Sequence, residues 1–475
     1  MITRHSKIVC TIGPATRSPR MIRKLIEAGM DVARLNFSHG KHEEHAQTIA
    51  MLREASGAMQ QPIAILADLQ GPKIRTGMLA GGGTVLLRAG QRFVITTARV
   101  LGDSTRVNTT FHPLPREVKR GDRVLLSDGL IELRVEKTSH SEVICQVANG
   151  GVLGEHKGIN LPGVELRVPA LTEKDRTDLR FALKHGVDYI AVSFVRRPED
   201  IELARALVRR VKEATPVIAK LEKPEAIDNL DDILRVSEGV MVARGDLGVE
   251  MSPERVPVVQ KNIIARAREF RRPVITATQM LESMTENPRP TRAEASDVAN
   301  AIFDGTDAVM LSAETATGKY PVEAVSMMSR IIEQAEASIH EYPRPAAMEQ
   351  LKVPETVAEL VCHASRELHM KLIAVFTHSG FTAGLVSRYR PLVPIIAFSP
   401  ERETRRRMAL LWGVTPCRIV DIKKIDGLAA IAEKRLLEER LVRKGDVVGI
   451  VAGTPMGIRG TTNFMKFHVI GHTES

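Results

Sequence analysis

Short apolar runs recur along the chain, and each one precedes a stretch with the apolar spacing of an amphipathic helix. Eight such runs cover residues 6–13, 30–38, 62–71, 188–195, 216–222, 239–247, 272–280 and 307–315. Runs that are apolar at nearly every position are typical of parallel strands buried on both faces. Eight strand–helix units favour a closed (β/α)₈ barrel, the TIM barrel, with a doubly wound open sheet as the alternative.

Two further regions break this pattern. Residues 72–168 contain many glycines and alternating strand-like segments, which predict a small β-barrel domain inserted between the third and fourth units. The barrel itself then comprises residues 1–71 and 169–341. From Tyr342 onwards a proline-containing linker leads into a C-terminal α/β domain (342–475), whose predicted strands are 371–377, 393–398, 446–452 and 464–470.

The charge of the chain bears on its partners. The formal net charge is +10, but the basic residues are dispersed, aromatic residues make up only 4%, and no nucleic-acid-binding motif occurs, so we expect no nucleic-acid partner. A basic balance suits an enzyme with anionic substrates. Because the sequence has no run of 18 apolar residues and no apolar leader, we expect a cytoplasmic protein without a membrane contact.

Candidate chemistry lies where the predicted strands end, since the active site of a (β/α)₈ barrel is built from the C-terminal ends of its strands. Seven of the eight runs end in charged or hydroxyl residues, which helix caps and solvated turns alone do not explain. These residues are Arg34, Asn36, Ser38, His39, Asp68, Lys73, Arg75, Ser193, Lys220, Glu222, Asp246, Thr278, Ser312 and Glu314.

Three of these residues predict a metal-assisted site. Lys220 and Glu222 are two apart on one strand, so their side chains point to the same face. Glu222 and Asp246, from neighbouring strands, offer the hard oxygen ligands that magnesium prefers. Lys220 supplies a fixed cation beside them.

Other strand ends indicate an anionic substrate. Arg34 and Arg75 can hold a phosphoryl group through forked hydrogen bonds. The backbone N–H groups near Gly245 and Asp246, at a helix start, can hold a carboxylate. Together these groups predict a site for a phosphorylated acid, in which positioning and charge neutralisation promote phosphoryl transfer.

Read in order, the strand ends resemble the motifs of the pyruvate kinase family along the whole chain. The matching segments are RLNFSHG, GPKIR, SF, KLEKPEAI, MVARGDLGVE, ITATQMLESM, PTRAEASDVANA and DGTDAVMLSAETA. The resemblance implies an enzyme of glycolysis that transfers the phosphoryl group of phosphoenolpyruvate to ADP, giving pyruvate and ATP. It implies Mg²⁺ as the cofactor, with Mn²⁺ as a substitute, and a homotetramer.

The resemblance also implies roles for individual residues. The catalytic groups would be Lys220, Arg34, Arg75 and Thr278, with Ser312 and Glu314 in the same polar network. Glu222 and Asp246 would hold the metal. The substrate would be bound by Lys220, Gly245, Asp246, Thr278 and Ser193, and the nucleotide by Pro14, His39, Arg75 and Lys157. The inserted domain would close over the site as a lid and exclude water.

A monovalent-cation site is the main departure from the family pattern. Asn36, Ser38, Asp68 and the Leu69 carbonyl match potassium ligands of relatives. Lys73 stands where the potassium-dependent members have glutamate, so its ammonium group is expected to replace the ion, and K⁺ is expected not to be required.

The C-terminal domain contains one further candidate site. Thr377, Ser379, Gly380 and Thr382 lie between a predicted strand and a helix, where hydroxyl and N–H groups can cradle a phosphate, although a helix cap has the same pattern. In relatives an allosteric activator binds here. The loop 453–463 lacks the tryptophan of relatives that bind fructose 1,6-bisphosphate, so the expected effector is a phosphorylated sugar or AMP.

Two other functions fit part of the pattern. A magnesium-dependent lyase or aldolase acting on pyruvate would share the carboxylates and the metal, but it would not use ADP. A ligand-sensing scaffold without activity would have lost a catalytic group, yet Lys220, Glu222, Asp246 and Thr278 are all present.

Overall fold

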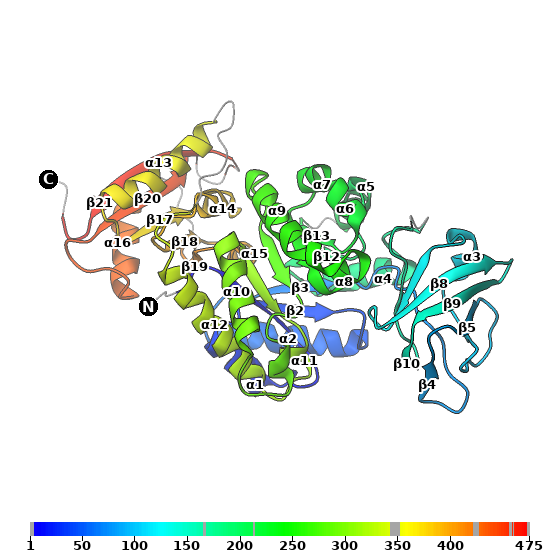
Figure 1. The fold of residues 1–475 in the computed structure, drawn as a ribbon. Helices are drawn as coiled ribbons and strands as arrows, with labels where there is room; N and C mark the ends of the chain where they lie inside the picture. The colour runs from blue at the N-terminus through cyan, green and yellow to red at the C-terminus, as the bar shows by residue number, and fades with distance from the viewer. Residues whose placement is uncertain are drawn as a thin grey trace.

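The computed structural model describes residues 4–164, 168–211, 214–342, 352–420, 427–455, 458 and 460–472. A barrel lies in the middle of the molecule, with the β-rich insertion at one end and the C-terminal domain at the other (Figure 1). The residues at which the three domains divide stay a prediction. Within the described ranges, none of the helices has both the length and the apolar character needed to cross a membrane.

The eight predicted strands form a closed parallel barrel, which confirms the (β/α)₈ interpretation and excludes the open sheet. Around the barrel the strands follow the order β1-β16-β15-β14-β13-β12-β3-β2. Their bounds are β1 (Lys7–Thr11), β2 (Val32–Asn36), β3 (Ala64–Asp68), β12 (Tyr189–Val192), β13 (Val217–Leu221), β14 (Gly239–Ala243), β15 (Val274–Ala277) and β16 (Ala308–Leu311).

Helices cover the outside of the barrel, and local signals in the sequence set where several of them begin. Ser18 caps α1, while Thr172 and Thr291 form capping boxes at α4 and α10. The helices are α1 (Pro19–Ala28), α2 (His42–Ala58), α4 (Glu173–Lys184), α5 (Pro198–Arg210), α6 (Pro224–Asp228), α7 (Leu230–Val236), α8 (Arg244–Glu250), η1 (Pro253–Arg255), α9 (Val256–Glu269), η2 (Glu282–Thr285), α10 (Arg292–Asp304), α11 (Ala313–Ala316) and α12 (Pro321–Ala337).

The barrel interior is an apolar core that the C-terminal domain helps to close. Inward-facing strand side chains such as Val9 and Met241 form one buried cluster with Ala409 and Leu410 of the C-terminal domain. The Tyr189 hydroxyl donates a hydrogen bond to a carbonyl of that domain, at Arg407, over 2.7 Å. One end of the barrel is therefore plugged, and the polar strand ends lie at the other.

The insertion is built from β-strands around a single apolar core, to which both of its sheets contribute. A six-stranded sheet has the order β11-β7-β8-β9-β5-β6, and β10 pairs with β4. The elements are β4 (Thr84–Leu87), β5 (Arg92–Thr96), β6 (Arg106–Asn108), α3 (Leu114–Glu117), β7 (Arg123–Leu126), β8 (Ile131–Thr138), β9 (Glu142–Asn149), β10 (Gly151–Gly154) and β11 (Ile159–Asn160).

The C-terminal domain is a five-stranded sheet with the order β19-β18-β17-β20-β21, in which only β21 runs antiparallel. Its elements are α13 (Val353–Glu367), β17 (Leu372–Phe376), α14 (Phe381–Arg388), β18 (Ile395–Ser399), α15 (Arg402–Met408), β19 (Val414–Arg418), α16 (Leu428–Glu438), β20 (Val447–Gly453) and β21 (Thr462–Val469). The sequence did not predict β19. That strand contains Pro416, and proline is tolerated there because β19 is an edge strand.

Candidate active site

The strand ends converge on the ammonium group of Lys220, at the end of β13. Its Nζ lies 2.8 Å from Glu222, 3.2 Å from Asp68 and 2.7 Å from the Ser193 hydroxyl. Burial by itself would lower the pKa of Lys220, but the two carboxylates raise it above its ordinary value. Lys220 is therefore a cation that stays charged and is held in one position.

Glu222 is a buried carboxylate that can share a metal ion. One of its oxygens contacts Lys220, and the other accepts a hydrogen bond from the Phe194 N–H at 2.9 Å. Burial and the nearby charge of Asp246 raise the pKa of Glu222, so a second cation would stabilise its ionised form. The described residues contain no cluster of three or more potential metal ligands, but two carboxylates fit Mg²⁺, which takes its remaining ligands from water and substrate oxygens.

Arg34, near the end of β2, forms an ion pair with one carboxylate oxygen of Asp68. Its Nε and Nη2 lie 2.7 and 2.6 Å from Asp68, and its Nη1 donates to the Thr11 hydroxyl at 2.9 Å. Burial would raise the pKa of Asp68, but the charges of Lys220 and Arg34 hold it below its ordinary value. Thr11 was missed from the sequence, although a hydroxyl at the end of the first apolar run was the available signal.

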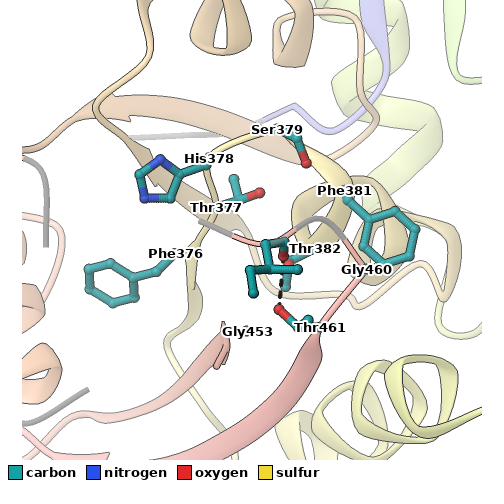
Figure 2. A pocket seen from close by; sticks show the side chains of 10 residues that line it. Phe376, Thr377, His378, Ser379, Phe381, Thr382, Gly453, Gly460 and Thr461 are labelled. Atoms are coloured by element: carbon teal, nitrogen blue, oxygen red, sulfur yellow. Dashed lines mark hydrogen bonds between the residues drawn. The ribbon is translucent and has the colours of Figure 1, made fainter. Parts of the chain in front are cut away.

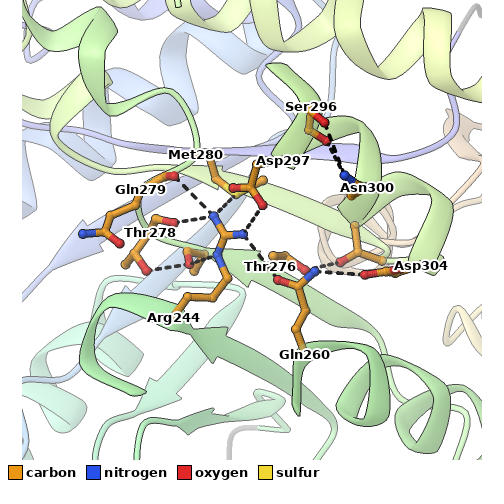
Figure 3. Close-up of polar contacts among 12 residues, drawn as sticks. Arg244, Gln260, Thr276, Thr278, Gln279, Met280, Ser296, Asp297, Asn300 and Asp304 are labelled. Carbon is orange, nitrogen blue, oxygen red and sulfur yellow. Dashed lines mark hydrogen bonds and ion pairs between the residues drawn. The ribbon is translucent and has the colours of Figure 1, made fainter. Parts of the chain in front are cut away.

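Thr278 lies in a polar network at the ends of β14 and β15 (Figure 3). Its hydroxyl accepts a hydrogen bond from the Gly245 N–H at 2.8 Å and donates to the Ala277 carbonyl at 2.6 Å. The Gly245 N–H, expected from the sequence to face a ligand carboxylate, is here engaged by a side chain.

Glu314 joins the ends of β15 and β16. It accepts hydrogen bonds from the Ser312 N–H at 2.7 Å and from the Leu281 N–H at 3.1 Å, and its burial raises its pKa. Ser312 and Glu314 therefore support the loop that follows Thr278.

The residues of the expected monovalent-cation site lie beside this centre. The Asn36 side chain accepts a hydrogen bond from the Ser38 N–H at 3.0 Å, and the Leu69 carbonyl accepts one from the Ser193 hydroxyl at 2.7 Å. The Lys73 side chain is exposed. Its charge is one of those that lower the pKa of His39.

A cleft beside this centre lies between the loops that follow β1 and β2 and the end of α11. It is lined by Pro14 and His39, two of the residues predicted to bind the nucleotide, and by Arg17 and Glu44, which form an ion pair at 2.9 Å. Burial and the charges of four cations lower the pKa of His39; these cations are Lys73, Arg75, Arg34 and Lys174. A neutral histidine amid positive charge suits a polyphosphate.

Arg75 and Lys157 lie on the two segments that connect the barrel to the insertion. Arg75 pairs with Gly158 in an isolated bridge, and its guanidinium donates to the His156 carbonyl at 3.2 Å. The Lys157 side chain is exposed. Arg75 thus contacts the segment that contains Lys157, whereas Arg34 contacts Asp68 in the barrel, and none of the contacts of the described residues joins the two arginines.

The C-terminal domain has a separate pocket, shown in Figure 2, between the β17–α14 loop and residues 453–461. Thr377, Ser379 and Thr382 line it, and Gly380 adopts a left-handed conformation at the start of α14. The Thr377 hydroxyl accepts a hydrogen bond from the Gly380 N–H, and the Thr382 hydroxyl bonds to Thr462. The predicted loop 453–463 forms the opposite wall, although residues 456, 457 and 459 lie outside the described part.

Lys220 between two carboxylates, with Arg34 beside it at the open end of a (β/α)₈ barrel, supplies the fixed positive charge that phosphotransferases use. Two family models match the chain: "Pyruvate kinase, barrel domain" over residues 3–325 and "Pyruvate kinase, alpha/beta domain" over residues 355–468. The chain therefore belongs to the pyruvate kinase family and is an enzyme of that class.

Individual relatives agree with this assignment. The chain is 47% identical to a pyruvate kinase of Mycobacterium tuberculosis over the full length of both proteins. It is also 47% identical to a pyruvate kinase of Staphylococcus aureus, over 98% of this chain and 81% of that protein. A crystal structure of a pyruvate kinase from Cryptosporidium parvum superimposes with a TM-score of 0.92 and 39% identity, over 98% of this chain and 96% of the other.

Proposed function

We propose that the enzyme transfers the phosphoryl group of phosphoenolpyruvate to ADP with the help of Mg²⁺, and that a phosphorylated metabolite activates it. The observation that carries the proposal is the position of Lys220, whose Nζ lies within 3.2 Å of Asp68, Glu222 and Ser193 at the ends of neighbouring strands. This arrangement supplies fixed positive charge where phosphoryl transfer develops negative charge.

Each residue of the site has a proposed role that follows from its position. Lys220 stabilises the enolate oxygen and the transferring phosphoryl group, and Arg34 binds the phosphoryl oxygens from β2. Thr278 orients the substrate and lies on the path of the proton to the methylene carbon. Glu222 and Asp246 would hold Mg²⁺, which supplies Lewis-acid stabilisation of the phosphoryl oxygens when bound.

The nucleotide is proposed to bind in the cleft that contains Pro14 and His39, with its phosphates towards the surrounding cations. Closure of the inserted domain would bring Lys157 and Arg75 to these phosphates and exclude water, so that the phosphoryl group reaches ADP and not a water molecule. We further propose a cytoplasmic location and a homotetrameric assembly; light scattering on the purified protein tests the assembly directly.

The first test is the initial rate of pyruvate formation from phosphoenolpyruvate, ADP and Mg²⁺. We expect turnover that depends on both substrates and on the metal. A rate of pyruvate formation that is the same with and without ADP would favour the lyase or aldolase alternative. No product, with AMP and a hexose monophosphate present, would favour the ligand-sensing scaffold.

Potassium is expected to leave this rate unchanged, since Lys73 supplies a positive charge near the nucleotide residues. Lys73→Glu should make turnover depend on added K⁺, because the substitution removes that charge and adds a carboxylate. The rate is measured in potassium-free buffer and again with KCl. Lys184→Glu, an exposed lysine on α4, is the matched control and should stay independent of potassium. A wild-type rate that appears only with potassium contradicts the role of Lys73.

Activation is expected to depend on binding of the effector's phosphate in the C-terminal pocket. Ser379→Glu places a carboxylate at the start of α14, where it would repel an effector phosphate. Activation by AMP or by a hexose monophosphate should disappear, while the rate without effector stays the same. Lys371→Glu, an exposed position before β17, is the control. Normal activation of Ser379→Glu would place the effector elsewhere.

A further inference from the structure

The turn after β15 has an unfavourable backbone conformation at the residue that carries the proposed proton path. Thr278 and Gln279 are consecutive non-glycine residues with φ of +69° and +53°. A β-branched residue such as threonine rarely adopts this left-handed region, and such conformations persist only where the surrounding structure imposes them. Some group outside the turn must therefore hold it.

Arg244, the first residue of α8, contacts every carbonyl of this turn. Its Nε donates to the Ala277 carbonyl at 3.3 Å, and its Nη2 donates to the carbonyls of Thr278 at 2.8 Å and Gln279 at 3.3 Å. Figure 3 shows the guanidinium lying against the turn on one side. One planar cation thus defines the orientation of three successive carbonyl groups.

The guanidinium is itself held by two helices on the outside of the barrel. Its Nη1 forms an ion pair with Asp297 of α10 at 2.7 Å and a hydrogen bond with Gln260 of α9 at 3.3 Å. The Arg244 side chain is only 10% exposed. The residue that follows it, Gly245, donates its N–H to the Thr278 hydroxyl at 2.8 Å, so the same helix start aligns both the backbone and the side chain of Thr278.

We propose that Arg244, anchored by Asp297, is a positioning residue: it imposes the left-handed turn at 278–279 and so aims the Thr278 hydroxyl at the substrate methylene. The inference rests on the proposed function. It predicts that loss of the guanidinium contacts to the turn slows proton transfer more than it weakens substrate binding. Lysine cannot replace the guanidinium, because its ammonium group is a point charge without the planar arrangement of donors.

Arg244→Lys is expected to lower kcat by up to roughly 100-fold with little change in either KM, as displacement of a catalytic group by about 1 Å does. The exchange of pyruvate methyl protons with deuterated solvent, followed by NMR, should slow by a similar factor. Asp297→Asn should produce a weaker form of the same pattern. Arg272→Lys is the matched control, since Arg272 also donates to successive carbonyls, at Leu234 and Arg235, but far from the turn.

A second variant separates positioning from general stability. Glycine adopts positive φ without strain, so Gln279→Gly should reduce the dependence of the turn on Arg244. The double variant Arg244→Lys/Gln279→Gly should therefore regain proton exchange at least several-fold relative to Arg244→Lys alone, and its loss of melting temperature should be smaller than the sum of the single losses.

The outcomes separate this inference from the proposed function. An unchanged kcat and exchange rate in Arg244→Lys, with wild-type pyruvate formation, overturns the role of Arg244 alone. So does equal loss in Arg244→Lys and Arg272→Lys, or strictly additive melting temperatures in the double variant. Absence of pyruvate formation by the wild type overturns the proposed function, while the melting-temperature comparison still decides whether Arg244 holds the turn.

Discussion

Lys220→Met is expected to lower turnover by roughly 10³-fold or more, because it removes the fixed cation from a site whose catalysis is mainly electrostatic. Lys220 contacts Asp68, Glu222 and Ser193, whereas Arg34 contacts Asp68 and the Thr11 hydroxyl and so does not occupy the same place. Divalent-metal binding should be retained, since the two carboxylates remain and a neighbouring positive charge is lost. Pyruvate formation measures the first effect, and calorimetric titration with Mn²⁺ measures the second.

Lys7→Met is the matched control for this substitution. Lys7 is also a buried lysine of a barrel strand, but it lies at the opposite end of the barrel, where its Nζ donates to the Val414 carbonyl at 2.8 Å. Its replacement should lower the melting temperature and leave kcat near the wild-type value. If Lys220→Met kept more than a tenth of the wild-type rate, Lys220 would not be the electrophile of this site.

Glu222→Ala is expected to raise the Mg²⁺ concentration needed for half-maximal activity by more than about 100-fold, the upper end of what loss of an outer-shell partner costs a metal site. Two losses combine here. The metal loses one of its two carboxylates, and Lys220 loses the closer of its two anionic partners, at 2.8 Å. The measurement is the rate of pyruvate formation across a series of Mg²⁺ concentrations at saturating substrates.

Glu336→Ala controls for removal of a buried carboxylate. Glu336 accepts hydrogen bonds from the N–H groups of His5 and Ser6, on the far side of the barrel from the strand ends. The Glu336→Ala substitution should destabilise the protein without changing the Mg²⁺ requirement. A Glu222→Ala enzyme with a normal Mg²⁺ requirement would assign the metal to other ligands.

The barrel could be predicted because the signals for its strands and helices lie within short segments of the sequence. Each strand is a nearly continuous apolar run of the right length, and several helices begin at a recognisable cap such as Thr172 or Thr291. Strand β19 escaped prediction for the converse reason. It is a half-buried edge strand that contains Pro416, so neither its hydrophobic pattern nor its residue types resemble those of a central strand.

By itself, the sequence determined which residues stand at the strand ends, because strand period and parallel order place Lys220 and Glu222 on one face and bring Asp68 to the same rim. Only the tertiary structure decided the partners of each group. The bonds of Arg34 to Thr11 and of Arg244 to the turn at Thr278 join segments 23 and 34 residues apart. Such pairings depend on barrel closure, rotamers and backbone conformation, and these follow from packing that no local pattern encodes.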